Sequence, residues 1–77
     1  TITGTINGSA TTEGSIQITG ATKTFASIIG GSNPLTLIDI DNTSTFNEAI
    51  SATNINVADS ITATAKKAIT ATVTVAP

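Results

Sequence analysis

The stretch ITATAKKAITATVTV, residues 61–75, decides the expected fold of this chain. Its apolar residues alternate with threonine over residues 61–65 and again over residues 69–75. A period of two places successive side chains on opposite faces of a β-strand, so the apolar residues share one face and the threonines share the other. Threonine and the β-branched residues also fit a half-buried sheet surface. The stretch therefore predicts two closing strands, the second of them long.

Lys66 and Lys67 separate these two runs, and neither residue favours the positive φ of a tight hairpin turn. Two interpretations remain open: one long strand with a bulge, or two strands that turn a corner between stacked layers. The lysine pair is also the one basic cluster of the chain. We interpret it as a guard against aggregation, because residues 68–76 carry no charge and no proline.

Further strands are predicted upstream, where short apolar alternations occupy residues 1–6, 15–19, 23–29 and 35–41. Ile55 and Val57 can begin another. Asn7-Gly8 is a hairpin signal, but residues 9–14 offer no alternating partner and are predicted to form a polar loop or a wide hairpin. The ITATA and ITATV segments resemble each other, but the similarity is short enough to follow from composition, and we expect no exact internal repeat.

One short helix is predicted near residues 45–53. Thr45 and Glu48 have the capping-box spacing, and Phe46 and Ile50 follow at helical spacing. Two turns are unstable alone, so this helix would have to pack on a sheet. The predicted fold class is mainly β, formally α+β: a single domain over residues 1–77, built as a small β-sandwich or β-sheet module of six to seven strands.

The composition indicates assembly. The chain has 77 residues, no cysteine, no histidine and two aromatic residues, Phe25 and Phe46. Twelve isoleucines, three valines and two leucines must form most of the core. A domain this small buries a modest share of its surface and gains when neighbours bury more. We therefore expect oligomerisation or assembly with other chains.

Charge and residue types exclude several functions. A net charge of −2 without arginine argues against a phosphate-reading surface, so no nucleic-acid partner is expected. No apolar run is long enough for membrane insertion. Without cysteine or histidine the common nucleophilic triads are missing, so we expect neither an enzyme nor a cofactor. Low charge and 17 threonines are typical of secreted fibres, surface layers and virion parts, which predicts an extracellular, cell-surface or virion location.

Asp39 and Asp41 are the carboxylates that could carry a site, because they share one strand face. With Glu48 they are candidates for calcium binding, although they miss the helix–loop–helix calcium pattern. The simpler interpretation is that Asp39 is a solvated strand end and that Asp41 belongs to the helix entry. Asn7 and Asn42 begin matches to the N-glycosylation acceptor pattern.

The predicted function is structural and non-catalytic: a subunit or module of an extracellular or virion assembly. Its terminal strands, residues 1–6 or 69–75, would add to the sheet of a neighbour. The partners would be copies of the chain or other structural proteins of the same particle. The alternative is a small carbohydrate-binding or adhesive β-module. The residues expected to carry the strand contacts are Ile2, Ile6, Ile69, Val73 and Val75.

Two resemblances agree with the structural prediction. Residues 55–77, INVADSITATAKKAITATVTVAP, resemble the alternating segments of phage tail-spike and baseplate-spike β-helices. In that family three chains intertwine into a rigid piercing rod, and this chain lacks the histidine-bearing metal tip found there. Separately, LTLIDIDNTSTFNEAISATNI (residues 35–55) and the later ITATV are similar to the strand–helix–strand modules inserted in flagellins and filament caps.

Overall fold

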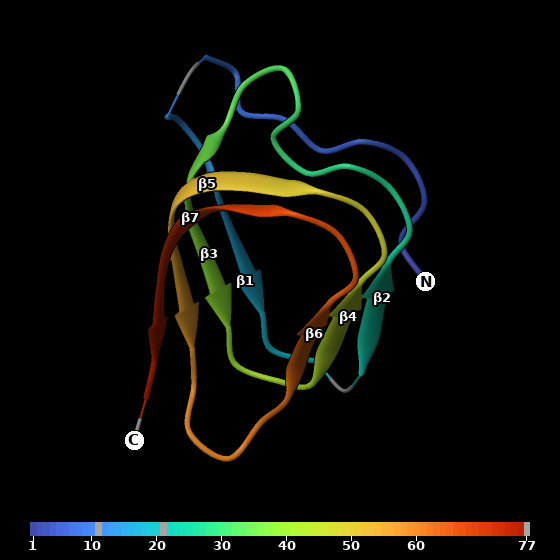
Figure 1. Ribbon diagram of the computed structural model, residues 1–77, viewed down its shortest axis with the longest axis vertical. Coiled ribbons are helices and arrows are strands. Elements are labelled where there is room, and N and C mark those ends of the chain that lie inside the picture. The colour runs from blue at the N-terminus through green and yellow to red at the C-terminus, as the bar shows by residue number, and fades with distance from the viewer. Residues whose placement is uncertain (11, 21, 77) are drawn as a thin grey trace.

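The computed structural model describes residues 1–10, 12–20 and 22–76, and these ranges contain seven strands and no helix (Figure 1). The mainly-β class and the strand number are thus as predicted, but the helix and the sandwich are wrong. The strands are β1 (Ser15–Ile18), β2 (Lys23–Phe25), β3 (Leu35–Ile40), β4 (Ser44–Phe46), β5 (Ile50–Val57), β6 (Ala63–Ala65) and β7 (Ile69–Val75).

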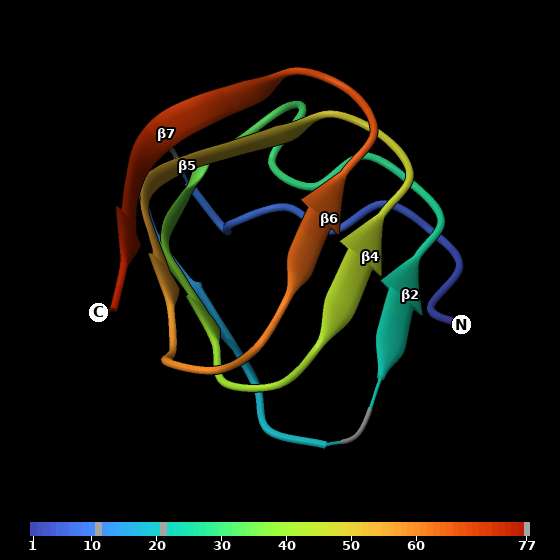
Figure 2. The same ribbon diagram turned by 60° about the horizontal axis from the view of Figure 1, so that its bottom comes forward.

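The chain winds as a β-solenoid. One sheet has the order β1-β3-β5-β7 and the other has the order β2-β4-β6, and every strand pair in both is parallel. The chain passes alternately through the two sheets, as Figures 1 and 2 show. Neighbouring strands of a sheet are therefore joined through the opposite wall, which makes them parallel instead of antiparallel as in a sandwich of hairpins.

Each turn of the solenoid is here called a rung, and the four rungs begin at Thr1, Thr24, Thr45 and Thr64. Between the two sheets, bridges at Ile6, Ile29 and Ile50 form a third wall. Inward residues stack from rung to rung in four columns. The columns are Ile2–Phe25–Phe46–Ala65, Ile6–Ile29–Ile50–Ile69, Ile16–Ile38–Ile55–Val73 and Ile18–Ile40–Val57–Val75.

This stacking reveals an inexact internal repeat, which the alternation along the sequence did not predict. Each rung opens with threonine, one inward residue, three variable residues and isoleucine, at residues 1–6, 24–29, 45–50 and 64–69. The spacing between successive copies falls from 23 to 21 to 19 residues, as the paired positions show. A search for one fixed period misses such a repeat.

The predicted helix is replaced by β4, a short link and the start of β5. Phe46 and Ile50 point into the core from two different walls, so their four-residue spacing spans a corner and not a helical turn. Neighbouring rungs satisfy the local backbone: the Asn47 amide donates to the Phe25 carbonyl (2.9 Å), and the Lys66 amide donates to the Phe46 carbonyl (3.0 Å). A two-turn helix would leave most of its end groups unpaired, whereas the parallel ladders bond both sides of the chain.

Of the remaining local predictions, some are confirmed and others are wrong. Lys66 and Lys67 lie between β6 of one sheet and β7 of the other, so the corner interpretation is confirmed. Residues 1–6 form isolated bridges at Ile2 and Ile6 in place of a strand. Asn7 makes no hairpin; its side-chain Oδ1 accepts the amides of Ser32 (2.9 Å) and Asn33 (3.3 Å) in the next rung.

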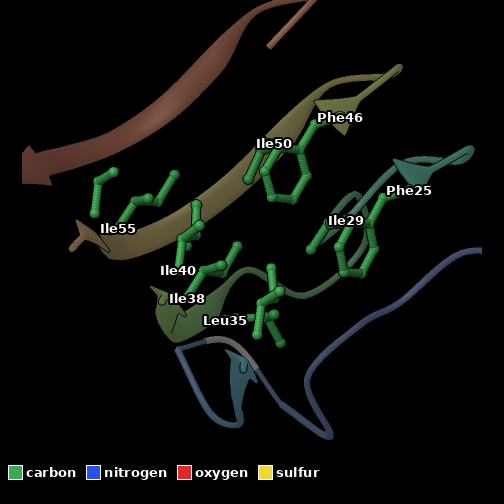
Figure 3. Close-up of a cluster of buried hydrophobic side chains, with 11 residues drawn as sticks. Phe25, Ile29, Leu35, Ile38, Ile40, Phe46, Ile50 and Ile55 are labelled. Carbon is green, nitrogen blue, oxygen red and sulfur yellow. The ribbon is translucent and has the colours of Figure 1, made fainter. Parts of the chain in front are cut away.

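The core fills the space between the walls (Figure 3). The Phe25 and Phe46 rings stack with their centroids 5.0 Å apart and 10° between their planes. The buried apolar residues all lie between positions 18 and 57: Ile18, Phe25, Ile29, Leu35, Ile38, Ile40, Phe46, Ile50, Ala52, Ile55 and Val57. Apart from Ile18, the inward side chains of the first and last rungs are therefore not fully buried.

Candidate assembly interface

The C-terminal end of the solenoid is formed by β6 and β7, the last strands of their sheets. Their alternation continues the inward columns, but the described chain has no rung beyond them. The exposed fraction within one column shows the effect, since it is 2% at Ile55 and 47% at Val73. At the tip of β7, Val75 reaches 65%. A column that is core inside the molecule is thus an apolar surface at its end.

A hollow of ≈ 320 Å³ opens at this end, lined by core residues of the second and third rungs and by inward residues of the fourth. Phe46 lies in its wall, and Ala65 follows Phe46 in the same column. Because alanine has no ring, the stack formed by Phe25 and Phe46 stops one rung early. The end is therefore both apolar and incompletely filled.

The backbone carbonyls within a column each accept an amide from the following rung, and the last rung adds one more carbonyl to this series. The carbonyls of Ile18, Ile40 and Val57 each accept an amide from the following rung at 2.9 Å. Val75 is the next residue of that column. In the first column, the carbonyls of Ile2, Phe25 and Phe46 also accept amides from the following rung, and Ala65 is next. The alternation of a parallel ladder directs the amides and carbonyls of Ala65 and Val75 to the open end.

The N-terminal end is the counterpart of this surface. Ile2, 37% exposed, and the partly buried Ile6 and Ile16 line a hollow of ≈ 280 Å³, with Phe25 in its wall. Gln17 and Lys23 lie at the same hollow and add polar groups. Both ends of the solenoid thus present the same columns, except that Ile18 of the fourth column is buried at the N-terminal end (4% exposed).

The residues expected to make strand contacts lie at these two ends. Ile2, Ile69, Val73 and Val75 are exposed large hydrophobic residues, and Ile6 is partly buried. Ile69 and Val73 line the C-terminal hollow, whereas Ile2 and Ile6 line the N-terminal hollow. Sequence reasoning missed Ala65 and Phe46, whose role becomes visible when the threonine–isoleucine repeat is aligned.

The two aspartates form a separate polar cluster on the outer face of the four-stranded sheet. Partial burial raises the pKa of Asp39, and the charge and hydrogen bond of Asp41 act in the same direction. The Gln17 amide group donates to Asp41 Oδ2 across the rungs at 3.0 Å. This arrangement links the first and second rungs at the surface.

Glu48, the third calcium candidate, does not join that cluster. It lies between β4 and β5, where its Oε1 accepts from Lys67 Nζ at 3.1 Å. Among residues 1–10, 12–20 and 22–76, no three carboxylates gather closely enough to hold a metal ion. Calcium binding therefore stays a prediction that rests on Asp39 and Asp41.

The two candidate glycosylation sites are hydrogen-bonded between rungs. Asn7 accepts the two amides described above, and Asn33 Nδ2 donates to the Gly8 carbonyl at 3.2 Å. Asn42 Nδ2 donates to the Thr19 carbonyl at 3.3 Å, and its Oδ1 accepts the Thr43 amide at 2.9 Å. These side chains hold the corners of the solenoid in register.

Comparison of the chain with protein-family models, with curated proteins and with solved structures finds no match. The fold and the geometry of the two ends therefore carry the functional argument. In the part of the chain that the structure describes, no helix is long and apolar enough to cross a membrane.

Proposed function

We propose that this chain is a structural, non-catalytic subunit or module of an extracellular or virion assembly, joined to other copies by contacts between strands. The observation that carries the proposal is the apolar C-terminal end, where Ile69, Val73 and Val75 are exposed. Solenoids normally need terminal repeats with a polar outer face to stay soluble. An end that continues the core columns instead favours a covering sheet.

The energies favour a contact that depends on concentration. Completing the burial of four half-exposed aliphatic side chains contributes roughly 3–6 kcal/mol, taking about half of the full value for each. Association costs about 4–15 kcal/mol in translational and rotational freedom. Strand pairing along β6 and β7 must therefore add to the apolar contact, and copies are expected to associate reversibly.

Composition and resemblance support the class of assembly. Low charge and abundant threonine fit an extracellular or virion component. The resemblance of residues 55–77 to spike β-helices supports a rod-like structural part, although here a single chain winds on itself. We do not extend the proposal to carbohydrate binding, because Phe25 and Phe46 are buried against each other and offer no ring to a sugar.

The proposal is tested with two lysine substitutions in β7. Val73→Lys places a charge on the inward column, whereas Thr74→Lys places the same charge on the outward face of the same strand. Light scattering should show a mass that rises with concentration for the unmodified chain and for Thr74→Lys. Val73→Lys should stay near 7.6 kDa, with its circular dichroism unchanged. Equal association of Val73→Lys and Thr74→Lys would contradict the proposal.

A further inference from the structure

We propose that a second copy docks head to tail, with its first rung seated on the fourth rung of its neighbour in one fixed register. In that register Ile2 of the incoming copy lies over Ala65, Ile6 over Ile69 and Ile16 over Val73. This inference rests on the proposed function and specifies which surfaces meet. The occupant of the apolar C-terminal end is thus the N-terminal end of the same chain.

The first and fourth rungs pass through the three walls of the solenoid in the same order, and this shared order supports the register. The fourth rung passes through the three-stranded sheet at Ala65, the third wall at Ile69, where β7 begins, and the four-stranded sheet along the rest of β7. The first rung passes through the same walls in the same order, at Ile2, Ile6 and β1. Stacking the first rung on the fourth therefore continues all the columns at once, as one further turn of the solenoid.

The backbone groups are complementary in this register. Ile2 directs its amide to Thr24 (2.7 Å) and its carbonyl to Ala26 (2.9 Å), both in the second rung. Alternation in a parallel ladder then turns the Thr1 carbonyl and the Thr3 amide away from the second rung. At the other end, the amide and the carbonyl of Ala65 point outward by the same rule. Donor thus meets acceptor when Ile2 lies over Ala65.

Contact between two identical ends fits less well. A twofold axis across the solenoid reverses the winding direction of one copy, so the three walls cannot all meet their own counterparts. Such a contact would also bring two pairs of Lys66 and Lys67 to one interface. In the head-to-tail contact each interface holds one such lysine pair, together with Lys23 of the N-terminal hollow, instead of two pairs.

The loops that follow residues 6 and 29 project from one corner of the solenoid, at the top of Figure 1, and so do not obstruct the contact. The Gly8 amide donates to the Asn33 carbonyl at 3.1 Å, and the Thr12 amide donates to the Pro34 carbonyl at 2.9 Å. These bonds hold the residues on either side of position 11 against the second rung, and Ile2 stays exposed while Ile6 and Ile16 are partly buried. The heterologous contact does not close on itself and so predicts a linear polymer.

Cysteine cross-linking tests the direction and the register, because the chain has no cysteine of its own. Ser15, Leu37, Asn54 and Thr72 form one outward column. The register places Ser15 of one copy one rung above Thr72 of its neighbour, about 4.8 Å away between Cα atoms, which a disulfide can span. An equimolar mixture of Ser15→Cys and Thr72→Cys should give at least ten times more disulfide dimer than either variant alone. A C-terminal tag on Ser15→Cys identifies the mixed dimer by mass.

Thr74→Cys mixed with Ser15→Cys is the matched control, because two residues along the strand raise the Cα separation to about 8 Å, beyond disulfide reach. Dimers of Thr72→Cys alone, or equal cross-linking in both mixtures, would overturn the head-to-tail register and leave the proposed assembly standing. If the unmodified chain associates but Ser15→Cys and Thr72→Cys do not cross-link, the register is likewise overturned and the proposed assembly stands. A chain that never associates would instead refute the proposed function.

Discussion

Gly30 is the residue on which the corner of the second rung depends. Its φ is +75°, and a Cβ added there would lie 2.1 Å from the Ser51 carbonyl oxygen. Its amide donates to the Ile6 carbonyl at 2.6 Å, so the backbone cannot move away without breaking the third wall. Gly30→Ala should therefore lower the free energy of unfolding by on the order of 3 kcal/mol, from backbone strain and overpacking together.

Gly4→Ala provides the control for this prediction. Gly4 also has a positive φ, +104°, but an added Cβ would meet no atom within 4 Å. Its substitution should cost backbone strain alone, roughly 1–2 kcal/mol, as measured by denaturant unfolding. Equal losses at the two positions would show that close packing against Ser51 is not the reason for glycine at position 30.

Asp39 makes the stability of the fold depend on pH. Partial burial and the neighbouring Asp41 raise the pKa of Asp39 above its ordinary value of 3.8. The folded state therefore binds this proton more tightly than the unfolded state, and stability falls as pH rises from 3.8 through the raised folded value. Asp39→Asn should raise the Tm at pH 7, and the gain should disappear below pH 3.8.

Asp59→Asn removes the same charge from an exposed turn after β5 and serves as the control for Asp39→Asn. It should leave the Tm at pH 7 nearly unchanged, because no second carboxylate accompanies it in the sequence. Thermal melts of both variants at pH 7 and pH 3 separate the two effects. An equal Tm gain for both at pH 7 would assign the effect to net charge alone.

At the scale of the strands, alternation predicted positions well but could not predict partners. The alternating runs that became β1, β3 and β7 were expected within a residue or two of their observed bounds. A period of two reports which side chains share a face, yet it is the same for parallel and antiparallel pairing. The solenoid was missed because its repeat shortens from rung to rung.

The wrong helix has a related cause. Phe46 and Ile50 are four residues apart, which suits one helix face as well as a corner between two walls. The corner is distinguished from a helix by Phe25 and Ile29, which have the same spacing one rung earlier. They stack directly beside Phe46 and Ile50. Only a partner distant in sequence distinguishes the two, so local spacing could not.

Only part of the candidate interface could be predicted, because local spacing does not show which rungs lie side by side. Val73 and Val75 stood out because they end a long uncharged strand. Ala65 did not, because alanine marks a hollow only when Phe46 is known to lie beside it. Contacts between rungs, which no local pattern contains, decide which apolar residues of the last rung matter.

The first column offers a direct test of this stacking. Ala65→Phe should continue the ring stack of Phe25 and Phe46 and fill part of the ≈ 320 Å³ hollow. Half-covered burial of a phenylalanine predicts a gain of about 1 kcal/mol in the free energy of unfolding, measured in dilute solution. Thr64→Phe, on the outward side of the same strand, should give no gain. A loss of stability in Ala65→Phe would mean that the column does not continue into the fourth rung.

At the scale of the whole molecule, the solenoid has two ends and no other open sheet edge in the part that the structure describes. Four rungs spaced by about 4.8 Å give an axial rise of about 19 Å for each copy in a head-to-tail polymer. Electron microscopy with helical reconstruction should therefore show one copy of 7.6 kDa per rise of about 19 Å. A markedly larger rise would mean that the end rungs of successive copies do not pair.

The central claim is that other copies cover the ends of this small fold, and the mass of the unmodified chain in solution tests it most directly. Sedimentation equilibrium over a wide concentration series should give an average mass that climbs above 7.6 kDa as concentration rises. The strand signal in circular dichroism should persist throughout. A folded chain whose mass stays at 7.6 kDa up to millimolar concentration would contradict the account.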